Sequence, residues 1–287
     1  MDADVLTQVL TQVAVVVSAL LLTSIVVFVG RERLVATARE WRSRIRASAP
    51  ALAGLAAVLW LNRVMRQAGP GISEFIGLHM TKAFYDIEGE FVLVFQSIAT
   101  EELTAYFSFI YVYGYAFLLI FPGIAYFALS ETRTFRRLLT AYSLNYVLGL
   151  VFYLLIIAYG PRNVMPEELT VTMLYDNSPE YQHLTREVNR NTNVFPSLHT
   201  SLSATVGIFA YKTRSSYPKW FPVAAVLAVS VAISTMYLGI HWGIDVVAGL
   251  TLAVSCVWLS DRLVGRRPTA AVRRYLDRRL EDRDERE

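Results

Sequence analysis

Two short polar stretches, each at the mouth of an apolar segment, decide how this chain is interpreted. Residues 189–199 read NRNTNVFPSLH and lead into the apolar run that begins at Ser197. Residues 234–245 read STMYLGIHWGID and end at the start of the last apolar run. Two of the four histidines, His199 and His241, lie in these stretches. Ionisable side chains at membrane-like segments are costly, so we interpret both as functional residues.

The composition indicates that most of the chain lies in a lipid bilayer. The 287 residues are 54% apolar and only 18% charged, and the mean hydropathy is +0.40, which is more apolar than ordinary globular domains. We therefore expect an integral membrane protein. The single cysteine, Cys256, lies in an apolar run, which excludes an intramolecular disulfide and a cysteine metal cluster.

Seven apolar segments are suited to crossing a hydrocarbon core about 30 Å thick. The first follows Asp2 and Asp4 rather than a basic start, so we expect an uncleaved anchor. Residues 67–102 mix apolar and charged side chains, as interfacial helices do, and Pro122 should kink the third span. The predicted fold is an all-α, polytopic membrane helix bundle. Its seven expected spans are residues 9–29, 47–62, 103–130, 138–159, 197–211, 220–238 and 243–260.

The basic residues are concentrated between alternate spans, in four segments that hold 21 of the 27 lysines and arginines. The positive-inside rule makes these segments cytoplasmic, so both motif histidines should face the extracytoplasmic side of a plasma membrane. The last segment mixes both signs and is typical of a solvated helix rather than a nucleic-acid arm. The four segments are residues 30–48, 131–137, 212–219 and 261–287. We expect N-terminal helices with an interfacial segment (1–102), a catalytic membrane core (103–261) and a charged cytoplasmic tail (262–287).

The first polar stretch is suited to binding an anion. Pro196 fits the first turn of a helix, so the amides of Ser197 and Leu198 should be unpaired donors at the positive end of that helix. Such an end favours a phosphate. His199 follows directly and stands beside this expected cradle.

The second polar stretch pairs a histidine with a carboxylate. His241 and Asp245 are four residues apart, hence on one face of a helix, where the carboxylate can orient the imidazole and stabilise its cation. The short return over residues 238–243 should bring His241 to the same membrane side as His199.

These residues resemble the type 2 phosphatidic acid phosphatase superfamily. Its signature is Lys-x6-Arg-Pro, then Pro-Ser-Gly-His, then Ser-Arg-x5-His-x3-Asp, and the resemblance covers roughly residues 138–260. The middle motif is similar to residues 196–199, and the third is matched at its own spacing by Ser234, His241 and Asp245. The resemblance implies that His241 attacks phosphorus, that Asp245 orients it and that His199 protonates the leaving group. It implies neither a metal nor an organic cofactor.

The chain departs from the signature in three places. No Lys-x6-Arg-Pro precedes His199, Thr235 stands in place of the third-motif arginine, and Leu198 replaces glycine. The Pro-Ser-Leu-His form is similar to the branch that includes inositol phosphorylceramide synthase, a lipid phosphotransferase. The candidates to replace the missing phosphate-binding cations are Arg190 and Arg162, with Arg186 and Lys82 as weaker choices.

The resemblance implies a membrane enzyme that acts on a lipid phosphate ester through a phosphohistidine. Transfer to water would make it a phosphatase and transfer to a lipid hydroxyl a synthase, and Leu198 favours transfer. Two other classes are open. Paired histidines could ligate haem, although Asp245 suits an anionic ligand better, and the span count also permits a receptor or an inactive scaffold.

Each candidate residue also has a purely structural interpretation. Either histidine could bond a carbonyl at the membrane interface. Asp245 and Ser197 could simply cap their helices. Arg190 and Arg162 could be solvated loop charges or contacts to lipid headgroups. The other two histidines, His79 and His183, lie outside any motif and are interpreted as structural.

Overall fold

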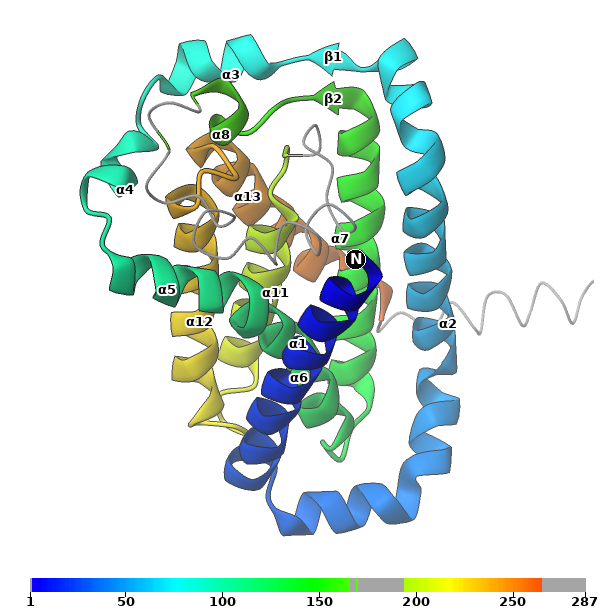
Figure 1. Cartoon of the computed structure of the whole chain (residues 1–287). Coiled ribbons are helices and arrows are strands. Elements are labelled where there is room, and N and C mark those ends of the chain that lie inside the picture. Colours follow the sequence, from blue (N-terminus) through cyan, green and yellow to red (C-terminus); the bar gives the residue numbers. More distant parts are fainter. Residues whose placement is uncertain (1, 166–168, 170–193, 265–287) are drawn as a thin grey trace, which may run out of the picture.

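The computed structural model describes residues 2–165, 169 and 194–264, and in this part the chain is a helix bundle (Figure 1). The expected all-α membrane bundle is confirmed. In chain order the elements, with η for π-helical segments, are α1 (Asp2–Ser24), η1 (Ile25–Val29), α2 (Arg31–Ile76), β1 (Leu78–His79), α3 (Thr81–Glu88), α4 (Leu93–Ser97), α5 (Glu101–Phe109), η2 (Ile110–Gly114), α6 (Tyr115–Phe127), α7 (Arg133–Leu155), β2 (Ile156–Ile157), α8 (Pro161–Val164), α11 (Leu198–Lys212), α12 (Trp220–Tyr237) and α13 (Gly243–Leu263).

More of the N-terminal region is helical than the sequence predicts. α1 and η1 contain the first expected span, and Gly30, at a φ of 80°, turns the chain into α2. The second expected span, residues 47–62, is only the middle of α2, which has 46 residues and includes Pro50 and Pro70. In Figure 1 the start of α2 crosses one end of the bundle, and the rest runs alongside α7.

Short elements gather at the other end of the bundle. α3 and α4 occupy the segment where interfacial helices are expected, and β1 pairs in parallel with β2 (Figure 1). The pairing sets Leu78 opposite Ile156, and the Thr81 hydroxyl accepts a hydrogen bond from the Tyr159 amide at 3.0 Å. These contacts tie the chain that follows α2 to the chain that follows α7.

The third expected span is one helical stretch made of α5, η2 and α6. Pro122 lies inside α6, and the irregular hydrogen bonding falls elsewhere, in the π-helical η2, whose five residues are all buried. Single π-helical turns inside α-helices are often found at functional sites. Here the turn supplies Tyr111, which contacts the candidate site described below.

By length and composition, six helical stretches of the described chain could cross a membrane, compared with the seven expected. The seventh is α11, which has 15 residues. At about 1.5 Å per residue it is roughly 22 Å long, shorter than a hydrocarbon core. It packs against α7, α12 and α13 in the middle of the bundle, so its neighbours surround it rather than lipid alone.

Buried polar contacts fix the register of α11 against α7. Asn145 of α7 is fully buried and donates to the Thr205 hydroxyl at 3.2 Å, while the Ser201 hydroxyl donates to the Asn145 carbonyl oxygen. Farther along, where α7 begins and α13 ends, Asp261 pairs with Arg137 and Lys212. The beginnings of α11 and α13 lie at the opposite end of these helices, and the candidate site is there.

Candidate active site

The return between α12 and α13 positions His241. The Thr235 carbonyl accepts hydrogen bonds from the Ile240 amide at 2.9 Å and the His241 amide at 3.0 Å, and Gly239 adopts a φ of 63°. A positive φ is easiest for glycine, which explains the residue at this turn. The return therefore folds back on the end of α12 and holds His241 directly before α13.

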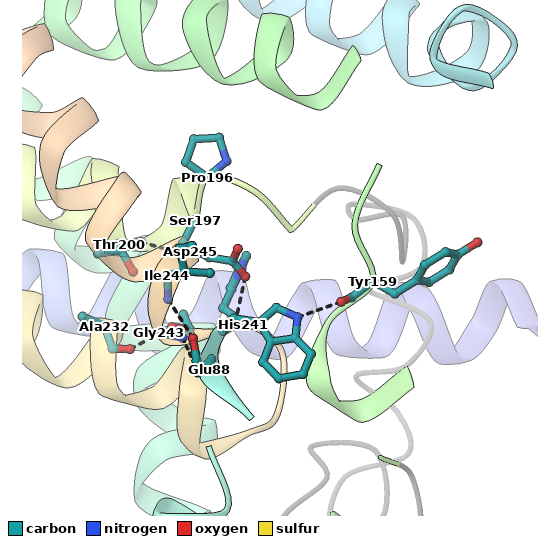
Figure 2. Close-up of polar contacts among 12 residues, drawn as sticks. Glu88, Tyr159, Pro196, Ser197, Thr200, Ala232, His241, Gly243, Ile244 and Asp245 are labelled. Atoms are coloured by element: carbon teal, nitrogen blue, oxygen red, sulfur yellow. Dashed lines mark hydrogen bonds and ion pairs between the residues drawn. The ribbon is translucent and has the colours of Figure 1, made fainter. Parts of the chain in front are cut away.

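Asp245 lies in the first turn of α13 and contacts His241 (Figure 2), which stands just before the helix rather than on the same helical face as the spacing predicted. Its Oδ2 is 3.3 Å from His241 Nδ1 and also accepts the Trp242 amide at 2.8 Å. The Asp245 side chain is fully buried, and its Oδ1 has no partner among the described residues. The carboxylate thus caps the helix and contacts one nitrogen of the imidazole, and the ring also hydrogen-bonds with the backbone of Val194.

Glu88 is a residue of this site that the sequence did not single out. It ends α3, and its two carboxylate oxygens accept the first amides of α13, from Gly243 at 2.7 Å and from Ile244 at 2.9 Å (Figure 2). A carboxylate is favoured at the positive end of a helix. In the sequence Glu88 is one of several acidic residues in a mixed segment, with no motif to separate it from the others.

Ser197 links the beginning of α11 to the beginning of α13. Its amide donates to the Asp245 carbonyl at 3.1 Å, and its hydroxyl accepts the Thr200 amide at 3.3 Å as a helix cap. The expectation that the Ser197 amide is an unpaired donor for phosphate is therefore wrong, because a backbone carbonyl occupies it. Pro196 also lies before the helix and not in its first turn, since α11 begins at Leu198. Gly249 makes the approach feasible, since a Cβ there would lie 2.6 Å from the Ser197 carbonyl oxygen.

Leu198, which replaces the glycine of the signature, is seated against α7. A Cβ added at Gly149 would lie 2.7 Å from Leu198 Cδ2. Gly149 thus provides the space that the larger side chain of the Pro-Ser-Leu-His form needs.

His199 points into the same region as His241. Its ring stacks on Tyr111, with centroids 4.6 Å apart, and lies 4.4 Å from the Tyr115 ring. The centroids of the His199 and His241 rings are 6.3 Å apart, and both side chains line one cavity of about 530 Å³. This separation lets a single phosphate group contact both imidazoles.

Arg162 is the predicted cation that the structure brings to the site. Its amide donates to the Gly239 carbonyl at 3.0 Å, which joins α8 to the return that carries His241. Gly160 permits this approach, because a Cβ there would collide with the Ile240 carbonyl oxygen. Burial lowers the pKa of His241 to about 3, and the charge of Arg162 contributes to that shift. The imidazole is therefore neutral at physiological pH, as a nucleophile must be.

The other residues considered from sequence do not add a cation within the described chain. Lys82 is exposed and pairs with Asp86 at 2.7 Å. Thr235 and Ser234 turn their hydroxyls back onto carbonyls of α12, both at 2.7 Å. Arg190, Arg186 and His183 lie outside the described residues. The described residues also contain no group of three His, Cys, Asp or Glu side chains placed to hold a metal ion.

Comparison with known proteins supports the resemblance noted in the sequence. The family model of the PAP2 superfamily matches residues 83–259, more than half of the chain. An uncharacterized protein of Methanocaldococcus jannaschii is 27% identical over 167 residues, which cover 56% of this chain and 62% of that protein. No solved structure matches the chain. The family match begins within α3, includes Glu88 and ends within α13, and on this evidence the chain belongs to the PAP2 superfamily.

Proposed function

We propose that this protein cleaves or transfers the phosphate ester of a membrane lipid through a phosphohistidine on His241. The observation that carries the proposal is the convergence of two separate motifs on one cavity. His199 comes from the beginning of α11 and His241 from the return before α13, yet both line the same cavity, and Asp245 holds Nδ1 of His241. Membership of the PAP2 superfamily supports phosphatase-type chemistry on a lipid.

In the proposed first step, Nε2 of His241 forms a bond to phosphorus while the bond from phosphorus to the ester oxygen breaks. The departing oxygen takes a proton from His199, which therefore acts as the general acid. The Asp245 carboxylate stabilises the positive charge that develops on the imidazole ring. In the second step a hydroxyl attacks phosphorus, His199 accepts its proton, and the bond to His241 breaks.

Binding of the phosphate must use groups other than the first amides of α13, since Glu88 already occupies two of them. Within the described chain, Arg162 is the cation that lies close enough to affect His241. We therefore propose Arg162 as one phosphate ligand and keep Arg190, on sequence grounds, as a second. Ser197 does not offer a free amide to the phosphate. Its amide instead joins the beginning of α11 to the Asp245 carbonyl of α13.

The acceptor in the second step defines two versions of the function. With water the protein is a lipid phosphatase, and with a lipid hydroxyl it is a phosphotransferase similar to inositol phosphorylceramide synthase. The packing of Leu198 against Gly149 favours the phosphotransferase, because it accommodates the leucine of the Pro-Ser-Leu-His form. Product analysis with and without an added lipid alcohol separates the two.

We further propose that the site faces the extracytoplasmic side of a plasma membrane. The cavity histidines lie at one end of the bundle, whereas the described part of the basic segments, which include Arg137 and Lys212, lies at the other. An excess of basic residues marks the cytoplasmic end. The substrate would then be drawn from the outer leaflet.

The test is turnover of a lipid phosphate and of a water-soluble aryl phosphate by purified protein, with excess EDTA in a parallel series. His241→Ala should abolish both activities. His199→Ala should reduce lipid phosphate turnover by about 10² to 10⁴-fold, and less for an aryl leaving group that departs without a proton. Asp245→Asn should fall between them, with the exposed Asp86→Asn as its matched control.

Activity should persist in EDTA, since a histidine nucleophile needs no metal to generate it. Activity that is lost in EDTA and restored by one divalent ion would contradict this mechanism. Absence of turnover on any lipid phosphate, with binding retained, would favour an inactive scaffold.

A further inference from the structure

The cavity beside the two histidines extends well beyond them, between α2 and α7. α2 contributes Leu59, Asn62 and Met65, and α7 contributes Tyr146, Leu150 and Tyr153. Figure 1 shows the later part of α2 running alongside α7. α2 lies outside the matched region of the PAP2 superfamily, residues 83–259, so this wall of the cavity is a feature of the chain beyond its family core.

The lining changes in character along the helices. Toward the site end, the cavity is bordered by polar groups that include Ser73, Glu74 and His79. Farther from that end, its wall includes Leu59, Met65 and Leu150 beside the polar groups of Asn62 and Tyr146, and Leu202 lies one helical turn beyond His199 in α11. The cavity is therefore polar at the membrane surface and mainly apolar at depth, which is the polarity order of a lipid in a leaflet.

The charges and the size of the cavity further limit which ligands it can bind. None of its described lining residues is a lysine or arginine, and Glu74 is acidic. A second phosphate would therefore find no cation in this part of the cavity and would meet a carboxylate. The volume of about 530 Å³ is typical of a drug-sized ligand and smaller than a whole two-chain phospholipid.

We propose that the apolar part of this cavity binds one hydrocarbon chain of the lipid substrate and that α2 forms its outer wall. The inference rests on the proposed function, because it takes the two histidines as the reacting end. In this proposal Met65 and Leu150 determine specificity because they contact the hydrocarbon chain of the lipid. They take no part in the reaction at phosphorus.

The experiment is a chain-length series of single-chain alkyl phosphates, from four to about sixteen carbons, assayed in detergent micelles beside a soluble aryl phosphate. For wild-type protein, kcat/KM should rise by up to about fourfold per methylene that enters the cavity. In Met65→Trp the rise in kcat/KM should stop at a shorter alkyl chain, because the larger side chain fills part of the cavity. In Met65→Ala the rise should continue to a longer alkyl chain. Turnover of the aryl phosphate should change less than twofold in both variants.

Val64→Trp is the matched control, because Val64 neighbours Met65 on α2, is 40% exposed and does not line the cavity. Its chain-length profile should equal that of wild type. Identical profiles in wild type, Met65→Trp and Met65→Ala would overturn the inference while leaving the proposed function intact. Failure of wild-type protein to turn over either kind of phosphate would instead count against the proposed function itself.

Discussion

Asp245 both caps α13 and contacts the imidazole of His241, two roles that the sequence analysis gave as alternatives. The same oxygen, Oδ2, accepts the Trp242 amide at the start of α13 and lies 3.3 Å from His241 Nδ1. The contact between His241 and Asp245 could be predicted because a four-residue spacing is local geometry. The contacts of Glu88 could not, because its carboxylate meets amides 155 and 156 positions away along the chain.

The first prediction concerns Glu88. Glu88→Gln replaces one accepting oxygen with a donor and removes a charge from the positive end of α13, so the two helix amides can no longer both be satisfied. We expect a loss of about 1–2 kcal/mol in the free energy of unfolding. We also expect a fall in kcat with little change in KM, because the beginning of α13 carries Asp245. Thermal unfolding and steady-state kinetics measure the two effects.

Glu90→Gln is the control for this substitution, since Glu90 is exposed on the same segment and its side chain makes no hydrogen bond or ion pair within the described chain. It should behave as wild type. Equal effects of the two substitutions would remove Glu88 from the positioning of the site.

The second prediction is a pH dependence. Because burial and Arg162 lower the pKa of His241 to about 3, this proposed nucleophile stays neutral well below pH 6.5 and should not cause an acid limb near that value. Removing the positive charge in Arg162→Gln should raise the pKa of His241. The acid limb of kcat/KM should then move to higher pH than in wild type, in addition to any loss of phosphate binding.

Both proteins are assayed on one aryl phosphate, so that ionisation of the substrate is common to the two profiles. Arg63→Gln removes an exposed arginine of α2 and should leave the profile unchanged. Parallel profiles for Arg162→Gln and wild type would show that Arg162 does not act on His241 through its charge.

At the scale of elements, the site depends on how closely α11 and α13 approach each other. The Ser197 amide donates to the Asp245 carbonyl, and Gly249 faces the Ser197 carbonyl oxygen at a distance that leaves no space for a Cβ. Two motifs that are far apart in sequence are joined here through backbone atoms. This explains why the cavity histidines hold their separation without a direct hydrogen bond between them.

The third prediction tests that approach. Gly249→Ala places a Cβ 2.6 Å from a backbone oxygen, which cannot turn away as a side chain could, so α11 and α13 must separate. We expect destabilisation of about 1–3 kcal/mol and loss of most of the activity. Thermal unfolding and turnover provide the measurement.

Gly123→Ala is the matched substitution, because Gly123 also lies inside a helix and has nothing within 4 Å of an added Cβ. It should be neutral or slightly stabilising, since alanine is the better helix former. A Gly249→Ala protein with wild-type stability and turnover would show that the close approach is not required.

Sequence patterns predicted the positions of the helices better than their ends and irregularities. Apolar length located the six helices that are long enough to cross a membrane, because the bilayer imposes that length, but it also predicted a span at α11, which has only 15 residues. It did not give the full extent of α2, which begins before residue 47, continues through Pro70 and packs against α7. The π-helical η2 could not be foreseen either, because its sequence is apolar and aromatic like that of an ordinary span.

At the scale of the whole molecule, the described charges are divided between the two ends of the bundle. Arg44 is buried near one end and donates to the Phe127 carbonyl at 2.9 Å, and Asp261 pairs with Arg137 and Lys212 near the same end. The cavity and Glu88 lie near the other end. This division could be predicted from the sequence, whereas the identity of every phosphate-binding cation could not, since Arg190 lies outside the described residues.

The fourth prediction is the orientation in the membrane. Single cysteines placed at the exposed positions Arg42 and Glu131 should be protected from an impermeant thiol reagent in intact cells, and cysteines at Asp86 and Glu101 should be labelled. The native Cys256 is buried and provides a low background. Labelling of the first pair and protection of the second would invert the proposed topology.

The central claim is that phosphorus is transferred to His241, and trapping the covalent intermediate tests it most directly. Purified protein is mixed with a phosphorus-labelled lipid phosphate, quenched in alkali because phosphohistidine is acid-labile, and mapped by peptide analysis. We predict label on His241 in wild-type protein, label on the same residue in His199→Ala when an aryl phosphate is the donor, and none in His241→Ala. Label on His199 instead, or undiminished turnover by His241→Ala, would contradict the account.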